Sequence, residues 1–266
     1  MRQLSKIIIL LLITSKIWPY SEKPLVSCIV SVYNGDQFIE DFFEDILEIT
    51  IFERCEFLIC LPDNSPGHEH DIITKYASKY PNIKYIRLRK DPGLYAIWNL
   101  LIKLAQADFI TNMNIDDRRN PYSLEREVKA LQDHPEWELV YASHLVTNSP
   151  NDTFKDSVAT KLVNAVPFDA SLMGSCLPGP QPLWRKSLHD KYGYFDEKLY
   201  SAADWELWNR AVSLGALFGH IEGISGIYYE NPQGISTDSD PEKTARRQEA
   251  LDYIVRTYCY MWKVYQ

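Results

Sequence analysis

The sequence predicts an α/β fold built on a Rossmann-like, mainly parallel sheet flanked by helices. Apolar, strand-like runs alternate with segments whose apolar residues recur at helical spacing. The links between these segments are short, and no internal repeat or long linker interrupts them. Strands that alternate with helices pair in parallel, and the helices then cover both faces of the sheet. One domain is the simplest organisation.

The composition supports this fold and excludes some functions. The chain has 266 residues, of which 45% are hydrophobic and 24% charged, enough for one substantial core. Its net charge is −8 and it has no basic block, so nucleic acid is excluded as the main partner, because phosphate neutralisation needs clustered Lys and Arg. The five cysteines show no zinc-type spacing and are expected to be free thiols.

Strand and helix alternate through the first half of the chain. The first strand, "LVSCIVSVY", ends at the turn "NGD", and the next segment places Phe38, Phe42 and Ile46 on one helical face. The same reasoning predicts the remaining strands at 55–62, 83–89, 108–115 and 137–143. The helices are predicted at 37–49, 70–80, 92–107 and 123–134.

The regular alternation of strand and helix ends at residue 148. Residues 147–157 and the Gly/Pro-rich segment 174–182 predict irregular structure. A helix is expected at 201–215, with Asp204 near its start and Gly215 at its end. Residues 238–262 suggest a closing helix. We therefore divide the chain into a main domain at 24–240 and a C-terminal helical segment at 241–266 that packs on it.

The N-terminus resembles a targeting segment. "MRQLSK" is a short basic stretch, and "IIILLLIT" adds about eight apolar residues, fewer than the ~20 that span a bilayer. Residues 1–23 are therefore interpreted as signal-like or as a weak anchor, with membrane association through residues 5–18. The location stays open between the cytoplasm or membrane of a bacterium and a secretory lumen, where the sequon at Asn151 would matter.

Polar residues follow three of the predicted strands. Ligands of open parallel sheets bind beyond the carboxyl ends of the strands, near the switch in strand order. This rule selects Tyr33-Asn34-Gly35, Asp63-Asn64-Ser65 and Asn114-Ile115-Asp116-Asp117. No Gly-rich phosphate loop is present. If a nucleotide binds, a cation such as Mg²⁺ or Mn²⁺ would have to neutralise its phosphates, and carboxylates suit those ions.

Four segments together resemble the family 2 glycosyltransferases, which have the nucleotide-sugar-binding GT-A fold. The segments are "VSCIVSVYNGDQFIEDFFEDIL", "PDNS", "DPGLYAIWNLLIKLAQADFITNMNIDDRRNP" and "GYFDEKLYSAADWELWNRAVSLG", within residues 25–232. The resemblance implies that Ser31 and Tyr33 contact the nucleotide base and that Asp63 hydrogen-bonds it, commonly at uracil. Pro62 stands where the family usually has a further acid. Asp63 could instead cap the turn "DNSPG".

The resemblance also implies a metal site and a catalytic base. "NIDD" matches the family's DxD motif with Asn114 at the first position, so Asp116 is assigned to ribose and metal, and Asp117 to metal and diphosphate. Gly93 is expected to let the backbone approach the donor. Asp204 in "AADWELW" matches the base, and a position near a helix N-terminus is expected to keep its pKa low. A charged turn and a simple helix cap remain the alternatives for these two motifs.

The resemblance therefore implies a metal-dependent, inverting glycosyltransferase that uses a nucleotide-diphosphate sugar, with UDP as the expected nucleotide. The acceptor stays open among glycan, lipid and protein hydroxyls. A catalytically degenerate binding module is the first alternative, because Pro62, Asn114 and Ala203 each replace an acid. A sugar nucleotidyltransferase is the second, although "SVYNGDQF" lacks the Gly-rich basic loop that a triphosphate needs.

Overall fold

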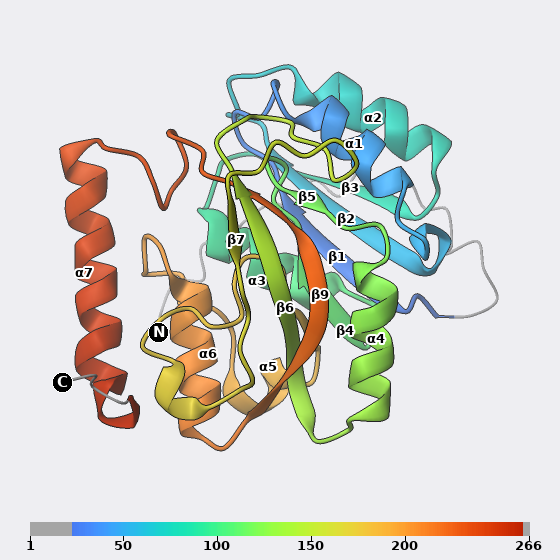
Figure 1. The fold of residues 1–266 in the computed structure, drawn as a ribbon. Coiled ribbons are helices and arrows are strands. Elements are labelled where there is room, and N and C mark those ends of the chain that lie inside the picture. Colours follow the sequence, from blue (N-terminus) through green and yellow to red (C-terminus); the bar gives the residue numbers. More distant parts are fainter. Residues whose placement is uncertain (1–22, 263–266) are drawn as a thin grey trace, which may run out of the picture.

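The computed structural model describes residues 23–262 and contains one sheet with helices on both faces (Figure 1). The strands are β1 Val26–Ser31, β2 Cys55–Pro62, β3 Ile83–Leu88, β4 Phe109–Asn112, β5 Arg118–Arg119, β6 Trp137–Thr147, β7 Lys161–Val163, β8 Leu183–Arg185 and β9 Leu217–Tyr229. The helices are α1 Ile39–Leu47, α2 Glu69–Lys79, α3 Leu94–Leu104, α4 Ser123–Asp133, α5 Leu188–Tyr192, α6 Ala203–Ser213 and α7 Pro241–Tyr258.

The sheet is mainly parallel, as predicted, but contains antiparallel pairs that the sequence did not reveal. Its strand order is β3-β2-β1-β4-β8-β6-β9-β5, with β7 paired to β6. β1, β2, β3 and β4 pair in parallel, and so do β6 and β9. β8 runs antiparallel to both of its neighbours. The order reverses between β1 and β4, which is the position where open α/β sheets bind ligands.

Two apolar clusters hold the helices against the sheet. The cluster on one face includes Phe42 and Phe43 of α1 and Leu124 of α4. The cluster on the other face includes Trp98 of α3, Trp184 of β8 and Trp208 of α6. Trp184 and Trp208 are almost completely buried, which gives them a packing role. Both faces of β1 are covered, so five of its six residues are buried. The buried Ser27 hydroxyl donates to Glu56 at 2.6 Å.

Local chemistry sets several boundaries differently from the predicted ones. The helix predicted at 201–215 begins at Ala203, because Ala202 adopts a left-handed conformation with φ 58°. The closing helix begins at Pro241, and the carboxylate of Asp240 accepts hydrogen bonds from the backbone N–H groups of Glu242 and Lys243, both at 3.0 Å. β9 escaped prediction because glycines interrupt its apolar pattern. At one of them, Gly219, a Cβ would lie 1.9 Å from the Trp137 ring.

α7 packs on α6 at one side of the molecule (Figure 1). Ile254 and Tyr258 of α7 form a small cluster with Trp205 of α6. Trp262 stacks on Trp205 with 5.6 Å between ring centroids, and its indole N–H donates to Asn209 at 2.9 Å. The residues after α6 therefore bring a second helix to the flank of the sheet.

The signal-like segment, residues 1–22, and the last four residues lie outside the described part of the chain. Within residues 23–262, no helix has the length and apolar content needed to cross a bilayer.

Candidate active site

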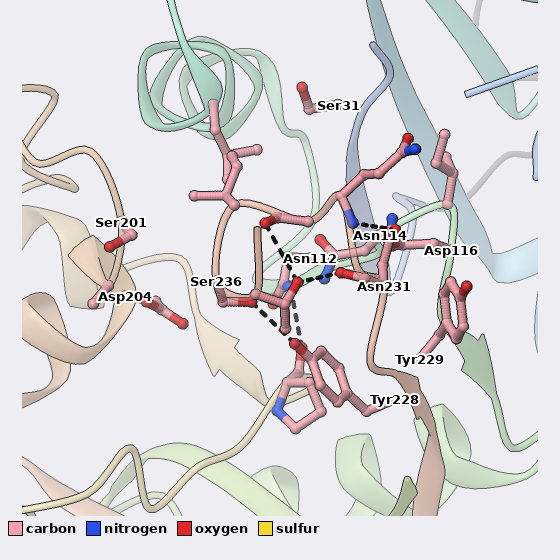
Figure 2. Close-up of a pocket in the computed structure, with 18 of the residues that line it drawn as sticks. Ser31, Asn112, Asn114, Asp116, Ser201, Asp204, Tyr228, Tyr229, Asn231 and Ser236 are labelled. Atoms are coloured by element: carbon pink, nitrogen blue, oxygen red, sulfur yellow. Dashed lines mark hydrogen bonds between the residues drawn. The ribbon is translucent and has the colours of Figure 1, made fainter. Parts of the chain in front are cut away.

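A cavity of about 850 Å³ opens at the carboxyl ends of β1 and β4. Residues at those strand ends form one wall, and the start of α6 forms the opposite wall. The segment that follows β9, residues 228–237, also lines the cavity. Figure 2 shows Asp116, Asn114 and Asn231 grouped on one side and Asp204 with Ser201 on the other. The cavity thus joins chain segments that are far apart in the sequence.

Residues after β1 form part of the first wall. Ser31 and Tyr33 both line the cavity, and the Tyr33 side chain is 48% exposed. The turn after Tyr33 passes close to the turn after β4. At Gly35 a Cβ would lie 2.2 Å from Ile115 Cδ1, so a larger residue would require the end of the Ile115 side chain to move. The "NG" turn therefore holds the aromatic ring of Tyr33 at the cavity mouth.

Asp116 and Asp117 are adjacent in sequence but face different surroundings. Asp116 lines the cavity together with Asn114, and its Oδ2 accepts a hydrogen bond from Asn231 Nδ2 at 2.9 Å. Asp117 is 4% exposed and does not line this cavity. Its Oδ1 accepts from the Tyr229 backbone N–H at 3.0 Å, and its Oδ2 accepts from Asn114 Nδ2 at 3.0 Å. Through these two bonds Asp117 fixes Asn114 and the end of β9.

The electrostatics of this acid pair favour a cationic ligand. Burial raises the pKa of Asp116, and the hydrogen bond from Asn231 only partly opposes it. Burial and the neighbouring Asp116 carboxylate raise the pKa of Asp117 well above its usual range. A cation in the cavity would offset both effects. Mn²⁺ and Mg²⁺ fit Asp116 and the Asn114 amide as oxygen donors, and they commonly add substrate phosphates to such a small set.

The described residues hold no cluster of three or more His, Cys, Asp or Glu side chains that would bind a metal alone. Sequence reasoning did not identify Asn231 as the residue that reaches Asp116. A cation at this site would therefore have few protein ligands. The diphosphate of a donor could supply the remaining oxygen ligands.

Asp204 lies in the first turn of α6 and lines the opposite wall. Burial raises its pKa, and the backbone N–H groups of Trp205 and of Asp204 itself lower it less. The expectation of a low pKa at this helix N-terminus is therefore wrong, because desolvation outweighs the helix contribution. Trp205 also lines the cavity, and its indole N–H donates to the Met173 carbonyl at 2.8 Å. This bond fixes the first turn of α6.

Two further predicted donor residues lie beside the cavity. Asp63 forms an ion pair with Arg87, with 2.5 Å between Oδ1 and Nη2, and it is partly exposed. Gly93 adopts φ 100° and precedes α3, and its N–H donates to Asp91 Oδ1 at 2.7 Å. Asp91 itself lines the cavity. Gly93 is thus close in sequence to a residue that lines the cavity, but neither Asp63 nor Gly93 lines it.

The arginines after the acid pair are buried and face away from the cavity. Arg119 pairs with Glu127 of α4. Arg118 donates to the carbonyls of Ile115 at 2.9 Å and Asp117 at 2.7 Å, and to Asn151 Oδ1 at 2.6 Å. Asn151 Nδ2 donates in turn to the Gln37 carbonyl at 2.8 Å. Because both ends of the Asn151 amide are engaged, this sequon lies in packed structure.

Two cations of α7, Lys243 and Arg247, also line the cavity, and sequence reasoning missed them. They stand one helical turn apart, a spacing that "EKTARRQ" displays, but nothing in the sequence shows where α7 docks. His144 lines the cavity too, and burial lowers its pKa to about 4, which keeps it neutral at pH 7.

The fold and this cavity define the class: an α/β enzyme with a ligand site at the switch point of a GT-A-type sheet. The profile of the family described as "Glycosyl transferase family 2" matches residues 27–163, which is just over half of the chain. The chain belongs to this family of glycosyltransferases.

Sequence relatives and solved structures agree with this assignment. The uncharacterized glycosyltransferase MJ1057 of Methanocaldococcus jannaschii is 23% identical over 255 residues, covering 92% of this chain and 86% of the relative. The putative glycosyltransferase EpsH of Bacillus subtilis is 30% identical over 203 residues, covering 76% of this chain and 54% of the relative.

The fold is similar to that of S. aureus TarS 1-349 in complex with UDP-GlcNAc, with a TM-score of 0.69, 17% identity, and coverage of 88% of this chain and 67% of that one. Mannosyltransferase PcManGT from Pyrobaculum calidifontis, in complex with GDP-Man and Mn²⁺, has a TM-score of 0.60 at 14% identity, covering 91% and 72%. These likenesses establish the GT-A fold.

Proposed function

We propose that this chain transfers a sugar from a nucleotide-diphosphate sugar, with uridine as the nucleoside, to an acceptor hydroxyl, with inversion at the anomeric carbon. One observation carries the proposal: Asp116 and Asp204, 88 positions apart in the sequence, line one cavity together with Ser31 and Tyr33. A direct displacement needs a charge-binding group and a base on opposite sides of the reacting carbon, and the two walls supply them.

The strand-end wall would bind the donor. Tyr33 and Ser31 would contact the base, and Asp63 would hydrogen-bond its edge from beside the cavity. Asp116 and Asn114 would hold Mn²⁺ or Mg²⁺ together with the diphosphate, and Gly93 would leave the backbone open near the ribose. The complexes of TarS with UDP-GlcNAc and of PcManGT with GDP-Man and Mn²⁺ support this type of donor and cation.

Asp117 would act as a positioning residue, because its two oxygens hold the Asn114 amide and the Tyr229 backbone. The main domain would comprise residues 24–240, with residues 241–266 closing its cavity through α7.

Asp204 would be the general base. Its carboxylate would take the proton of the acceptor hydroxyl while that oxygen bonds to the anomeric carbon and the bond from this carbon to the diphosphate breaks. The raised pKa makes Asp204 a stronger base than an exposed carboxylate. A bound Mn²⁺ or Mg²⁺ would supply positive charge where the leaving diphosphate becomes more negative. The reaction needs no covalent intermediate.

The test is a calorimetric titration of UDP into the full chain with and without Mn²⁺, with GDP as the comparison. We expect UDP binding that strengthens when Mn²⁺ is present. If GDP binds more tightly than UDP, guanosine takes the place of uridine in the proposal, and the proposed mechanism is unchanged. If no nucleoside diphosphate binds with or without Mn²⁺, the transferase proposal fails and a degenerate module becomes the better explanation.

A further inference from the structure

The described residues that line the cavity include two cations, Lys243 and Arg247, and the proposed transfer uses neither. The other titratable side chains among them include the carboxylates Asp91, Asp116 and Asp204. Among the described residues, neither cation forms an ion pair with Asp91, Asp116 or Asp204, so both can face an anionic partner in the cavity.

Helical geometry places this pair on the base side of the cavity. Lys243, Arg247 and Leu251 recur every four residues and all line the cavity, so one face of α7 points into it over about 12 Å. Farther along α7, Ile254 and Tyr258 pack against Trp205, the neighbour of Asp204. Arg246, the neighbour of Arg247, lies 4.2 Å from the centre of the Tyr200 ring, just before α6 begins at Ala203. The cation pair therefore stands on a helix that flanks the start of α6, where Asp204 lies.

Both side chains have hydrogen-bond donors that a ligand can use. The Lys243 side chain is 47% exposed, and its ammonium group donates to Asp238 Oδ2 at 2.5 Å, with two further donors for a ligand. Arg247 donates to the Asp238 carbonyl at 2.7 Å, the Ile235 carbonyl at 3.4 Å and Thr244 Oγ1 at 3.1 Å. All three acceptors are neutral, and no carboxylate of residues 23–262 forms an ion pair with Arg247. The hydrogen bond from Lys243 lowers the pKa of the Asp238 carboxylate, which also lies near enough for the Arg247 charge to lower it further. The guanidinium donors that these bonds leave over can serve an anion.

We propose that Lys243 and Arg247 form an anion site on the acceptor side of the cavity and that the acceptor carries a phosphate group close to the hydroxyl that Asp204 deprotonates. The combination of a planar guanidinium fork and a mobile ammonium suits the several oxygens of a phosphate. This proposal rests on the proposed transferase function. It adds the chemical class of the acceptor.

The experiment titrates sn-glycerol 3-phosphate into the full chain, alone and saturated with UDP and Mn²⁺, and compares it with glycerol. We expect glycerol 3-phosphate to bind and glycerol to give no signal. Lys243→Gln and Arg247→Gln should each weaken glycerol 3-phosphate binding by about tenfold, the loss expected for one charge-assisted contact. UDP affinity should change by less than about twofold.

Arg246→Gln is the matched control. Arg246 is the neighbour of Arg247 on α7, and its guanidinium lies 4.2 Å from the centre of the Tyr200 ring, outside the cavity lining. This variant removes the same charge and should leave both titrations unchanged. Lys243→Gln retains the bonds from Arg247 to Ile235 and Asp238, so a thermal melt like that of the wild type will separate loss of binding from loss of folding.

Three results would overturn the anion site: no binding of glycerol 3-phosphate to the UDP-saturated chain, equal weakening in the Arg246 control, or a loss of UDP affinity as large as the loss for glycerol 3-phosphate. The last result would place the cations on the donor diphosphate. Failure of the transferase proposal has a different signature. UDP would not bind, while glycerol 3-phosphate would still bind through Lys243 and Arg247.

Discussion

The two walls of the cavity are built on different principles. The first wall comes from the ends of neighbouring parallel strands, β1 and β4, which pair in register from Val26 with Phe109 to Ile29 with Asn112. The second comes from α6 and α7, whose positions depend on contacts such as Trp205 with Trp262. Strand pairing brings Ser31 and the segment of Asp116 to the same edge, where Asn231 from the segment after β9 holds the Asp116 carboxylate. Asp204 and the α7 cations reach the cavity only after the helices dock.

Because the two walls are built differently, substitutions in each wall should change different properties of the protein. Changes at the strand ends should affect donor binding while the fold stays intact. Changes on α6 and α7 should affect turnover, acceptor binding or the stability of the docked helices. We therefore expect variants of the two walls to change donor binding and turnover separately. The variants below are ordered from the largest expected effect to the smallest.

The largest effect is expected at the base. Asp204→Asn keeps the shape of the side chain but removes its proton-accepting charge, so turnover of the donor sugar should fall roughly 10²–10⁴-fold. Affinity for UDP with Mn²⁺ should remain. The measurement is release of UDP from UDP-sugars in the presence of Mn²⁺. Wild-type turnover in Asp204→Asn would assign the base elsewhere, with Glu206 as the reserve; Glu206 is 3% exposed and paired with Arg210.

Asp116 and Asp117 provide a matched pair of substitutions. Asp116→Asn removes the carboxylate that lines the cavity, so Mn²⁺-dependent strengthening of UDP binding should fall roughly tenfold to hundredfold or more. Asp117→Asn should have a smaller effect, because Asp117 acts through Asn114 and the Tyr229 backbone. Mn²⁺ titrations of both UDP-bound variants check this order. A greater loss in Asp117→Asn would make Asp117 the principal ligand.

A pH effect on stability is expected beneath the helical wall. Burial lowers the pKa of His189 to about 4, and His189 accepts a hydrogen bond from Trp184 Nε1 at 2.9 Å. The folded state therefore disfavours the protonated ring. Stability is fully present above the ordinary pKa near 6.5 and is lost as the pH falls towards 4, by at most about 3 kcal/mol.

Urea unfolding at several pH values, in wild type and His189→Gln, measures this contribution. The variant should lose less stability than wild type between pH 6.5 and 4, because it cannot take up the proton. Parallel curves for the two proteins would contradict the assignment to His189.

The smallest effect is expected beside the cavity. Asp63 forms a partly exposed ion pair with Arg87, so Asp63→Ala should change the free energy of unfolding by less than about 1 kcal/mol. If Asp63 hydrogen-bonds the base, affinity for UDP should fall by about tenfold. Calorimetry and chemical unfolding measure the two quantities separately. Unchanged UDP affinity would leave Asp63 as a turn residue.

The sequence predicted the strand-end wall better than the helical wall, for a physical reason. Apolar runs and turn residues mark β1 and β4, and the rule for parallel sheets then places Tyr33, Asn114 and Asp116 at the edge where the cavity lies. The same signals do not reveal how a carboxylate is oriented, so they did not show that Asp117 is buried and bonded to Asn114 and the Tyr229 backbone. The antiparallel strand β8, which spans three residues, was too short to detect.

The helical wall depends on long-range contacts that no local pattern encodes. α7 docks on α6 through the cluster of Ile254 and Tyr258 with Trp205. The strand-end wall also has one such contact, because Asn231 meets Asp116 across 115 positions. The pKa of Asp204 was misjudged for the same reason. Proximity to a helix N-terminus is visible in the sequence, whereas the burial that raises the pKa is created by the tertiary fold.

The most direct test of the two-walled site is a calorimetric titration of UDP, in the presence of Mn²⁺, into wild type, Asp116→Asn and Asp204→Asn. The account predicts that Asp116→Asn loses most of the Mn²⁺-dependent affinity and that Asp204→Asn retains it. Equal loss in both variants, or full affinity in Asp116→Asn, would contradict the division of the cavity into a donor wall and a base wall.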